Sequence, residues 1–123
     1  MESFSVLVCV TDQKRCERLI VAGAEIAKET GARLVVIHVA RPDGRMLEYK
    51  SAPEALEYLL QVSVSHGADM VVVRSNDIVG TLEAQAREQR AKVLVAGRAE
   101  NYTGHDVLDD LSERLPEVEI KIR

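Results

Sequence analysis

The chain has 123 residues and a mass of 13.6 kDa, which is enough for one domain with a buried core, spanning residues 1–123. Its content of 46% hydrophobic and 29% charged residues is ordinary for a globular protein. A net charge of −4 and a pI near 5.4 argue against phosphate-backbone binding as the main role, because nucleic-acid-binding domains carry a basic face.

Two further features of the sequence favour the cytoplasm. The N-terminal MESFSVLVCV lacks the basic and long apolar regions of a signal peptide, and no apolar stretch approaches the roughly 20 residues that span a bilayer. The 2 cysteines, Cys9 and Cys16, are too few for a disulfide framework. We therefore expect a cytoplasmic protein with neither a membrane nor a nucleic-acid partner.

Apolar runs and amphipathic segments alternate along the chain. Continuous or alternating apolar residues predict strands over residues 5–10, 33–39, 69–73, 93–96 and 118–123. Apolar residues at helical spacing predict helices over residues 13–30, 52–65 and 106–115, and a third helix that Ser75 or Asn76 caps and that reaches about Arg90. Gly31, Gly67 and Pro116 are expected to end the other helices.

Each predicted helix has one apolar face, so helices should cover both faces of a mostly parallel α/β sheet through right-handed crossovers. A similarity between TGARLVVIHV and HGADMVVVRS supports repeated βα units in a Rossmann-like fold. The expected core positions are Cys16, Leu19, Ile20, Gly23, Ala24 and Ala27 in the first helix; Ala55, Leu56, Leu59, Leu60 and Val64 in the second; Ile78, Val79, Leu82 and Ala86 in the third; and Val107, Leu108, Leu111 and Leu115 in the fourth.

A short polar loop follows the fourth predicted strand in KVLVAGRAENYTG, residues 92–104. Ligands of open parallel α/β sheets bind in the crevice at the carboxyl ends of the strands. The loop after Gly97 therefore has the position of a phosphate-binding loop. Its chemistry differs, because Glu100 places a carboxylate where phosphate would lie.

Four segments, SVLVCVTD, GARLVVIHVARP, DIVGTLEAQAREQRAKVLVAGR and VEIKI, resemble the universal stress protein superfamily. The sequence is most similar to the stress-protein domain of the KdpD potassium-sensor kinases, and the likeness covers nearly the whole chain. The resemblance implies a five-stranded parallel sheet of strand order 3-2-1-4-5, usually in a dimer. It also implies ATP binding in some members.

The resemblance also assigns a ligand site. ATP-binding members carry an Asp at the end of strand 1, a Val in strand 2 and a G-2x-G-9x-G-[S/T] loop after strand 4. Here Thr11 stands in place of the Asp, with Asp12 one residue later, and Val39 matches the Val. Gly97 matches the first Gly of the loop. The expected ligand-binding residues are Thr11, Asp12, Val39, Gly97, Arg98, Gly104 and His105.

Glu100 replaces the second glycine of this loop, and the segment before Gly104 and His105 is much shorter than in the family. The family's glycines let backbone N–H groups approach phosphate. Two like charges ~4 Å apart repel by roughly 1 kcal/mol in water and about 4 kcal/mol near a protein surface. Arg98 and His105 could compensate in part. We therefore expect no tightly bound cofactor, and weak binding of an adenine nucleotide stays open.

A rival motif is the C-x5-R spacing of Cys9 and Arg15, which resembles the nucleophile loop of low-molecular-weight tyrosine phosphatases. Such loops need small residues and exposed N–H groups around the oxyanion. CVTDQKR instead has Asp12 inside the loop and no glycine, and the acidic D-P motif of those enzymes is missing near the C-terminus. A buried structural Cys9 is the favoured interpretation, since cysteine is among the most buried residue types.

The remaining polar residues have structural explanations. The 3 histidines lack metal-ligand spacing, so no metal site is predicted. His38 is expected in a strand or at its end with a partner, and His66 at a helix C-terminus, where positive charge is favoured. The basic group Lys14, Arg15 and Arg18 is expected on a solvated surface, with an anion site as the alternative. Asp106, Asp109 and Asp110 suit the start of the fourth helix.

These observations predict a regulatory or ligand-sensing domain that acts by binding, because no nucleophile, base and oxyanion set can be assembled from the sequence. Two alternatives stay open: a ligand-free dimeric protein-interaction module, and a weak nucleotide hydrolase or phosphatase. We expect a homodimer through the last strand, where Val118, Ile120 and Ile122 alternate with charged residues, and a signalling protein as a further partner.

Overall fold

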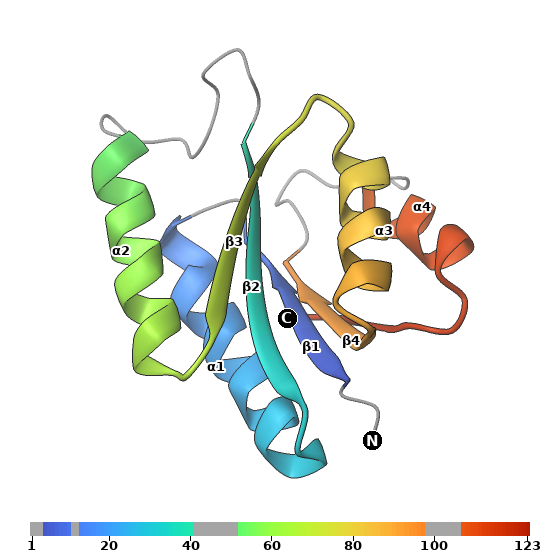
Figure 1. The fold of residues 1–123 in the computed structure, drawn as a ribbon, viewed down its shortest axis with the longest axis horizontal. Helices are drawn as coiled ribbons and strands as arrows, with labels where there is room; N and C mark the ends of the chain where they lie inside the picture. Colours follow the sequence, from blue (N-terminus) through green and yellow to red (C-terminus); the bar gives the residue numbers. More distant parts are fainter. Residues whose placement is uncertain (1–3, 11–12, 41–51, 98–106) are drawn as a thin grey trace.

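The computed structural model describes residues 4–10, 13–40, 52–97 and 107–123 (Figure 1). Strands and helices alternate in these ranges, as the hydrophobic patterns predict. The elements are β1 (Ser5–Cys9), α1 (Gln13–Thr30), β2 (Arg33–Ala40), α2 (Ala52–Ser65), β3 (Asp69–Arg74), α3 (Ile78–Glu88), β4 (Ala91–Ala96), α4 (Val107–Arg114) and β5 (Glu119–Ile122).

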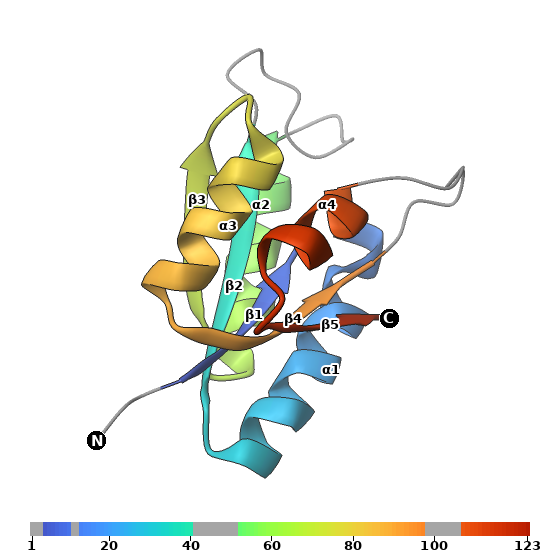
Figure 2. The ribbon, with the colours of Figure 1, turned by 90° about the vertical axis from the view of Figure 1, so that its right-hand side faces the viewer.

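The five strands form one parallel sheet of order β3-β2-β1-β4-β5, which confirms the predicted fold class and strand order. Helices α1 and α2 cover one face, and α3 and α4 cover the other (Figures 1 and 2). β1 lies at the centre and all of its side chains are buried. Val6 and Val8 pack with α1 and α2, whereas Leu7 and Cys9 pack with α3 and α4.

Three glycines fit the backbone as their positions require. Gly31 and Gly67 follow α1 and α2 with φ angles of +73° and +75°, the left-handed conformation in which glycine carries no steric cost. Gly23 lies in the middle of α1 for a different reason. A Cβ atom at this position would overlap Cγ2 of Val8, so glycine lets α1 approach β1 closely.

The start of α3 differs from the prediction. The N-cap is Asp77, whose Oδ1 accepts a hydrogen bond of 2.9 Å from the backbone N–H of Gly80. Ser75 instead accepts from the N–H of Asp77 at 3.0 Å, in the turn that leads into the helix. The helix ends at Glu88 rather than near Arg90, because Gln89 is its C-cap and Arg90, with a φ of 55°, completes the turn into β4.

Strand boundaries also shift by one or two residues. β4 begins at Ala91, earlier than predicted, because Ala91 pairs with Ser5 at the start of β1. β3 extends to Arg74 through its pairing with Ala40. β5 is shorter than predicted, and α4 begins at Val107, while Asp106 lies outside the described residues.

The apolar faces of the helices are mostly as predicted, with one correction in α2. Leu59 is fully buried, but Leu60 is 47% exposed and Val64 is 64% exposed. Tyr58 donates a hydrogen bond of 3.2 Å to Glu17, so that side of α2 faces α1. By helical spacing, Leu60 and Val64 lie on the side of α2 that faces away from α1. The side chain of the predicted core residue Ala55 lies outside the described residues.

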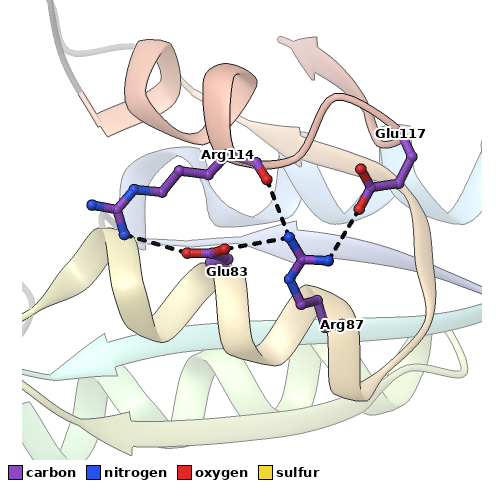
Figure 3. Close-up of polar contacts among 4 residues, drawn as sticks. All are labelled: Glu83, Arg87, Arg114 and Glu117. Carbon is purple, nitrogen blue, oxygen red and sulfur yellow. Dashed lines mark hydrogen bonds and ion pairs between the residues drawn. The ribbon is translucent and has the colours of Figure 1, made fainter.

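Four charged residues connect α3, α4 and the turn before β5 (Figure 3). Glu83 forms ion pairs of 3.4 Å with Arg87 and 3.3 Å with Arg114, and Arg87 forms a further pair of 3.4 Å with Glu117. Arg87 also donates a hydrogen bond of 3.2 Å to the backbone carbonyl of Arg114 at the end of α4. This network holds the two helices of one face together at their exposed side.

Among the helices of the described residues, none is long and apolar enough to cross a membrane.

Candidate functional site

The candidate ligand crevice lies at the carboxyl ends of β1 and β4. In β1, Cys9 pairs with Ile37 of β2 on one side and with Ala96 of β4 on the other. The chain leaves β1 toward α1 on one face, whereas it leaves β4 toward α4 on the opposite face (Figure 2). The ends of β1 and β4 are therefore the topological switch point of the sheet, where open α/β folds bind ligands.

Two of the predicted ligand-binding residues are described, and both lie at this edge. Val39 follows Ile37 by two residues and is 9% exposed, on the α3 and α4 face of the sheet. Gly97 is half-buried and comes directly after Ala96, the last residue of β4. Val39 lies near the end of β2 and Gly97 directly after β4, so the two residues lie on either side of the end of β1. The other predicted ligand residues lie outside the described ranges, as does Glu100: Thr11, Asp12, Arg98, Gly104 and His105.

A hydrogen bond from β2 fixes the exit of β1. The backbone N–H of Val10 donates to the carbonyl of Ile37 at 3.0 Å. The Val10 carbonyl lies 2.9 Å from Nδ1 of His38, and because a carbonyl can only accept, the imidazole donates from Nδ1. His38 is 1% exposed, and among the described residues its Nε2 has no hydrogen-bond partner. Val10 is the last described residue before Thr11, so this bond fixes the backbone at the carboxyl end of β1.

The sequence predicted a partner for His38 but not its role beside the crevice. Its position in β2, two residues after Val36, predicts a side chain on the α1 and α2 face. The signal that could have identified its role is the combination of a polar residue on a buried face and a strand end next to the switch point. The partner is a backbone carbonyl of the neighbouring strand, which side-chain motifs do not reveal.

Cys9 does not have the properties of a nucleophile. Its side chain is 7% exposed and packs in the core with α3 and α4. Burial raises the pKa of the Cys9 thiol from 9.0 to about 12, so the thiol stays protonated at neutral pH. A phosphatase needs a lowered thiol pKa. The structure therefore supports the structural interpretation of Cys9 over the C-x5-R motif.

Arg18, one of the three basic residues at the start of α1, has a structural partner. Its Nη2 donates a hydrogen bond of 3.1 Å to the backbone carbonyl of Arg123. The backbone N–H of Arg123 in turn donates to Ala96 at 2.9 Å, so Arg18 connects α1 to the β4–β5 edge. The side chains of Lys14 and Arg15 lie outside the described residues.

Two other structural predictions are confirmed. His66 follows α2, and its Nδ1 lies 2.9 Å from the carbonyl of Val62 in the last turn. Asp109 and Asp110 lie in the first turn of α4, near the positive end of the helix dipole.

Comparison with known structures identifies the fold. The universal stress protein of Archaeoglobus fulgidus superposes with a TM-score of 0.73 at 22% identity, covering 99% of this chain and 94% of that protein. A complex of that protein with dAMP gives a TM-score of 0.71 at 22% identity, over 99% and 98% of the two chains. A universal stress protein in complex with cAMP gives a TM-score of 0.68 at 18% identity, over 100% and 98% of the two chains.

The chain therefore has the universal stress protein fold. In sequence it is similar to the sensor protein KdpD of two Mycobacterium tuberculosis strains, CDC 1551 / Oshkosh and H37Rv, with 38% identity over 92 residues. That match covers 75% of this chain and 10% of the relatives, so the chain spans about a tenth of their length. The predicted resemblance to universal stress proteins and to KdpD sensor proteins is therefore confirmed. No family model matches the chain.

Proposed function

We propose that this chain is a regulatory domain of the universal stress protein family that binds a small ligand at the ends of β1 and β4. The observation that carries the proposal is the topological switch point, where Val39 near the end of β2 and Gly97 after β4 lie on either side of the end of β1. Structures of the same fold are complexes with cAMP and dAMP, which supports an adenine nucleotide as the ligand class.

The proposed crevice is an altered form of the family's nucleotide site. Glu100 replaces a glycine of the phosphate loop, so a ligand with several phosphate charges meets an additional carboxylate. A nucleotide with a single phosphate group meets less repulsion than ATP. We therefore propose weak adenine-nucleotide binding in which the charge of the phosphate portion determines affinity.

Backbone amide shifts on addition of AMP, cAMP or ATP test the proposal. We expect the largest NMR perturbations at Val10, Val39 and Gly97 and in the predicted loop residues, with AMP and cAMP acting at lower concentration than ATP. His66, which lies between α2 and the amino end of β3, serves as the internal reference. Perturbations confined to residues far from the ends of β1 and β4 would reject the crevice.

The raised pKa of Cys9 disfavours the thiolate that a phosphatase would use, which supports binding over that alternative. The ligand-free interaction module stays the second candidate, and the exposed apolar residues beside β3 favour it. No shift with any nucleotide, together with a stable dimer, would favour that module over the ligand-binding domain.

The partner predictions remain proposals. Similarity to KdpD sensor proteins supports a signalling partner, and a cytoplasmic location stays a prediction from the sequence. The homodimer predicted through the last strand is also untested, although β5 does lie at an open edge of the sheet with Ile122 41% exposed. The mass of the protein in solution, measured by light scattering, determines whether a dimer forms.

A further inference from the structure

A pocket with a volume of about 310 Å³ lies at the end of the sheet opposite the crevice. Residues 24–28 of α1, residues 32–34 at the start of β2 and residues 66–69 between α2 and β3 contribute to its walls. We call it the amino-end pocket, because β2 and β3 begin there. Its volume lies at the lower end of the range for small-molecule sites.

The pocket forms because α1 and α2 separate above the start of β2. Tyr58 donates a hydrogen bond to Glu17, which joins the two helices near their N-terminal ends. From there the helices diverge toward their C-terminal ends (Figure 1). The residues that line the space between these ends include Ala24 of α1 and Gly67 after α2, whose side chains are too short to fill it.

The floor of the pocket is apolar and continuous with the core. Ala27 of α1 is 7% exposed and Leu34 of β2 is 6% exposed, and both belong to the cluster of buried residues under α1 and α2. Burial of apolar surface on such a floor stabilises a ligand that has an apolar part.

Two charged residues of the lining direct their charges elsewhere. The guanidinium group of Arg33 donates a hydrogen bond of 3.0 Å to the backbone carbonyl of Gln89, which follows α3 on the other face of the sheet. Asp69 precedes Met70, which packs with the α1 and α2 core, so alternation along β3 directs the Asp69 side chain toward the other face as well. Both residues therefore line the pocket mainly with their backbone.

Lys28 and His66 supply the remaining charged groups of the lining, and both can carry a positive charge. Lys28 lies in the last turn of α1, and none of the ion pairs among the described residues includes it. Nδ1 of His66 lies 2.9 Å from the carbonyl of Val62, so Nδ1 donates to the end of α2. Nε2 is the ring nitrogen left for a ligand, and it donates when the imidazole is protonated.

The helix ends explain part of this charge but not the pocket. Cations are favoured near the C-terminal carbonyls of a helix. Here backbone N–H groups already bond to several of these carbonyls: Ala32 donates to Ala27 at 3.1 Å, and Ala68 donates to Ser63 at 2.9 Å. Compensation of the helix ends also gives no reason for an unfilled apolar space between the two cationic side chains.

We propose that the amino-end pocket binds a small organic carboxylate. The apolar part of the ligand lies on Ala27 and Leu34, and its carboxylate accepts hydrogen bonds from Nζ of Lys28 and from Nε2 of protonated His66. Charge-assisted hydrogen bonds of this kind are stronger than neutral ones. The inference does not rest on the proposed crevice, because Leu34 lies at the start of β2 and Val39 near its end.

An NMR titration with hexanoate in mildly acidic buffer tests the site. We expect backbone amide shifts at Ala32, Leu34 and Gly67, and about tenfold weaker binding of hexylammonium, which has the same chain and the opposite charge. AMP, which is larger than hexanoate, should leave Gly67 unshifted. Shifts at Gly67 with hexanoate but none anywhere with AMP would support the pocket and reject the crevice. No shift at Gly67 with hexanoate, or equal affinity for the two probes, would overturn the pocket.

Three variants separate the pocket from general surface charge. Lys28→Gln should raise the dissociation constant for hexanoate by about tenfold, as expected for one charge-assisted hydrogen bond. Lys92→Gln removes the same charge from β4, where the ammonium lies 3.8 Å from the centroid of the Phe4 ring, and should leave binding unchanged.

Ala24→Leu, one turn before Lys28 in α1, should abolish binding because the larger side chain fills the pocket. Circular dichroism confirms that each variant folds. Equal effects of Lys28→Gln and Lys92→Gln, or full binding by a folded Ala24→Leu variant, would overturn the inference.

Discussion

The imidazole of His38 donates a hydrogen bond of 2.9 Å to the carbonyl of Val10, and so joins β2 to the carboxyl end of β1. We expect His38→Leu to lower the free energy of unfolding by about 1–3 kcal/mol, because the buried carbonyl of Val10 loses its side-chain donor. Urea denaturation measures this change.

Ser63→Ala is the matched control for His38→Leu. Ser63 is also fully buried and donates to a backbone carbonyl, that of Leu59 at 2.7 Å, but this carbonyl lies inside α2. The helix supplies that carbonyl with its own backbone N–H donor, so the control should lose less stability. If both variants lose the same free energy of unfolding, the hydrogen bond to Val10 contributes no more to stability than the bond within α2.

The sequence predicted α1 and α2 with their observed boundaries, because Gly31 and Gly67 end amphipathic runs in the conformation that glycine favours. It missed the cap of α3 because Ser75, Asn76 and Asp77 are all good capping residues, and only the backbone geometry selects Asp77.

Helical periodicity in the sequence could not predict that Leu60 and Val64 are exposed. Helical spacing shows which residues share a face, but not where the sheet beneath that face ends. β3 is the last strand on this side, so no further strand of the described residues lies beside the outer flank of α2. The sequence placed Val39 and Gly97 at the carboxyl ends of their strands, as the structure does, but it could not show that a histidine on β2 donates to the Val10 carbonyl.

Gly23 provides a test of the contact between α1 and β1. Alanine normally stabilises a helix interior relative to glycine by roughly 0.5–1 kcal/mol. Here the added Cβ overlaps Cγ2 of Val8, so Gly23→Ala should instead destabilise the fold by about 1–3 kcal/mol. Thermal unfolding shows whether Gly23→Ala raises or lowers the stability of the fold. Combining it with Val8→Ala should recover part of the loss, and strictly additive losses would show that the two residues do not compete for space.

The ion pairs of Glu83 should contribute modestly and depend on salt. Its side chain is 27% exposed and bridges Arg87 and Arg114, which are about half exposed. We expect Glu83→Gln to lower the free energy of unfolding by about 0.5–1 kcal/mol at low salt, and by less at high salt. Glu113→Gln, at an exposed position of α4, should change stability less. Equal effects would mean that the network in Figure 3 adds nothing beyond a general surface charge.

The buried thiol of Cys9 should make stability fall in alkaline solution. In the unfolded chain the thiol ionises near its ordinary pKa of 9.0, whereas in the folded chain it stays protonated up to about 12. Above pH 9 the unfolded state therefore binds fewer protons, and this group lowers the free energy of unfolding by up to about 1.4 kcal/mol per pH unit. Cys9→Val removes the effect. Identical slopes for both proteins between pH 9 and 11 would contradict the burial of the thiol.

Glu100 should control nucleotide affinity at the proposed crevice. Glu100→Gly removes both the side chain and its charge from the predicted phosphate loop, whereas Glu100→Gln removes the charge and retains the bulk. We expect both variants to bind ATP more tightly than the unmodified protein, by about tenfold for the charge alone, since a change of 1.4 kcal/mol is tenfold in affinity. Isothermal titration with ATP and AMP measures this, and the gain should be larger for ATP because it carries more phosphate charge. Glu113→Gln on α4 serves as the charge control. Tight ATP binding by the unmodified protein, or equal gains for ATP and AMP, would show that Glu100 does not face the phosphates.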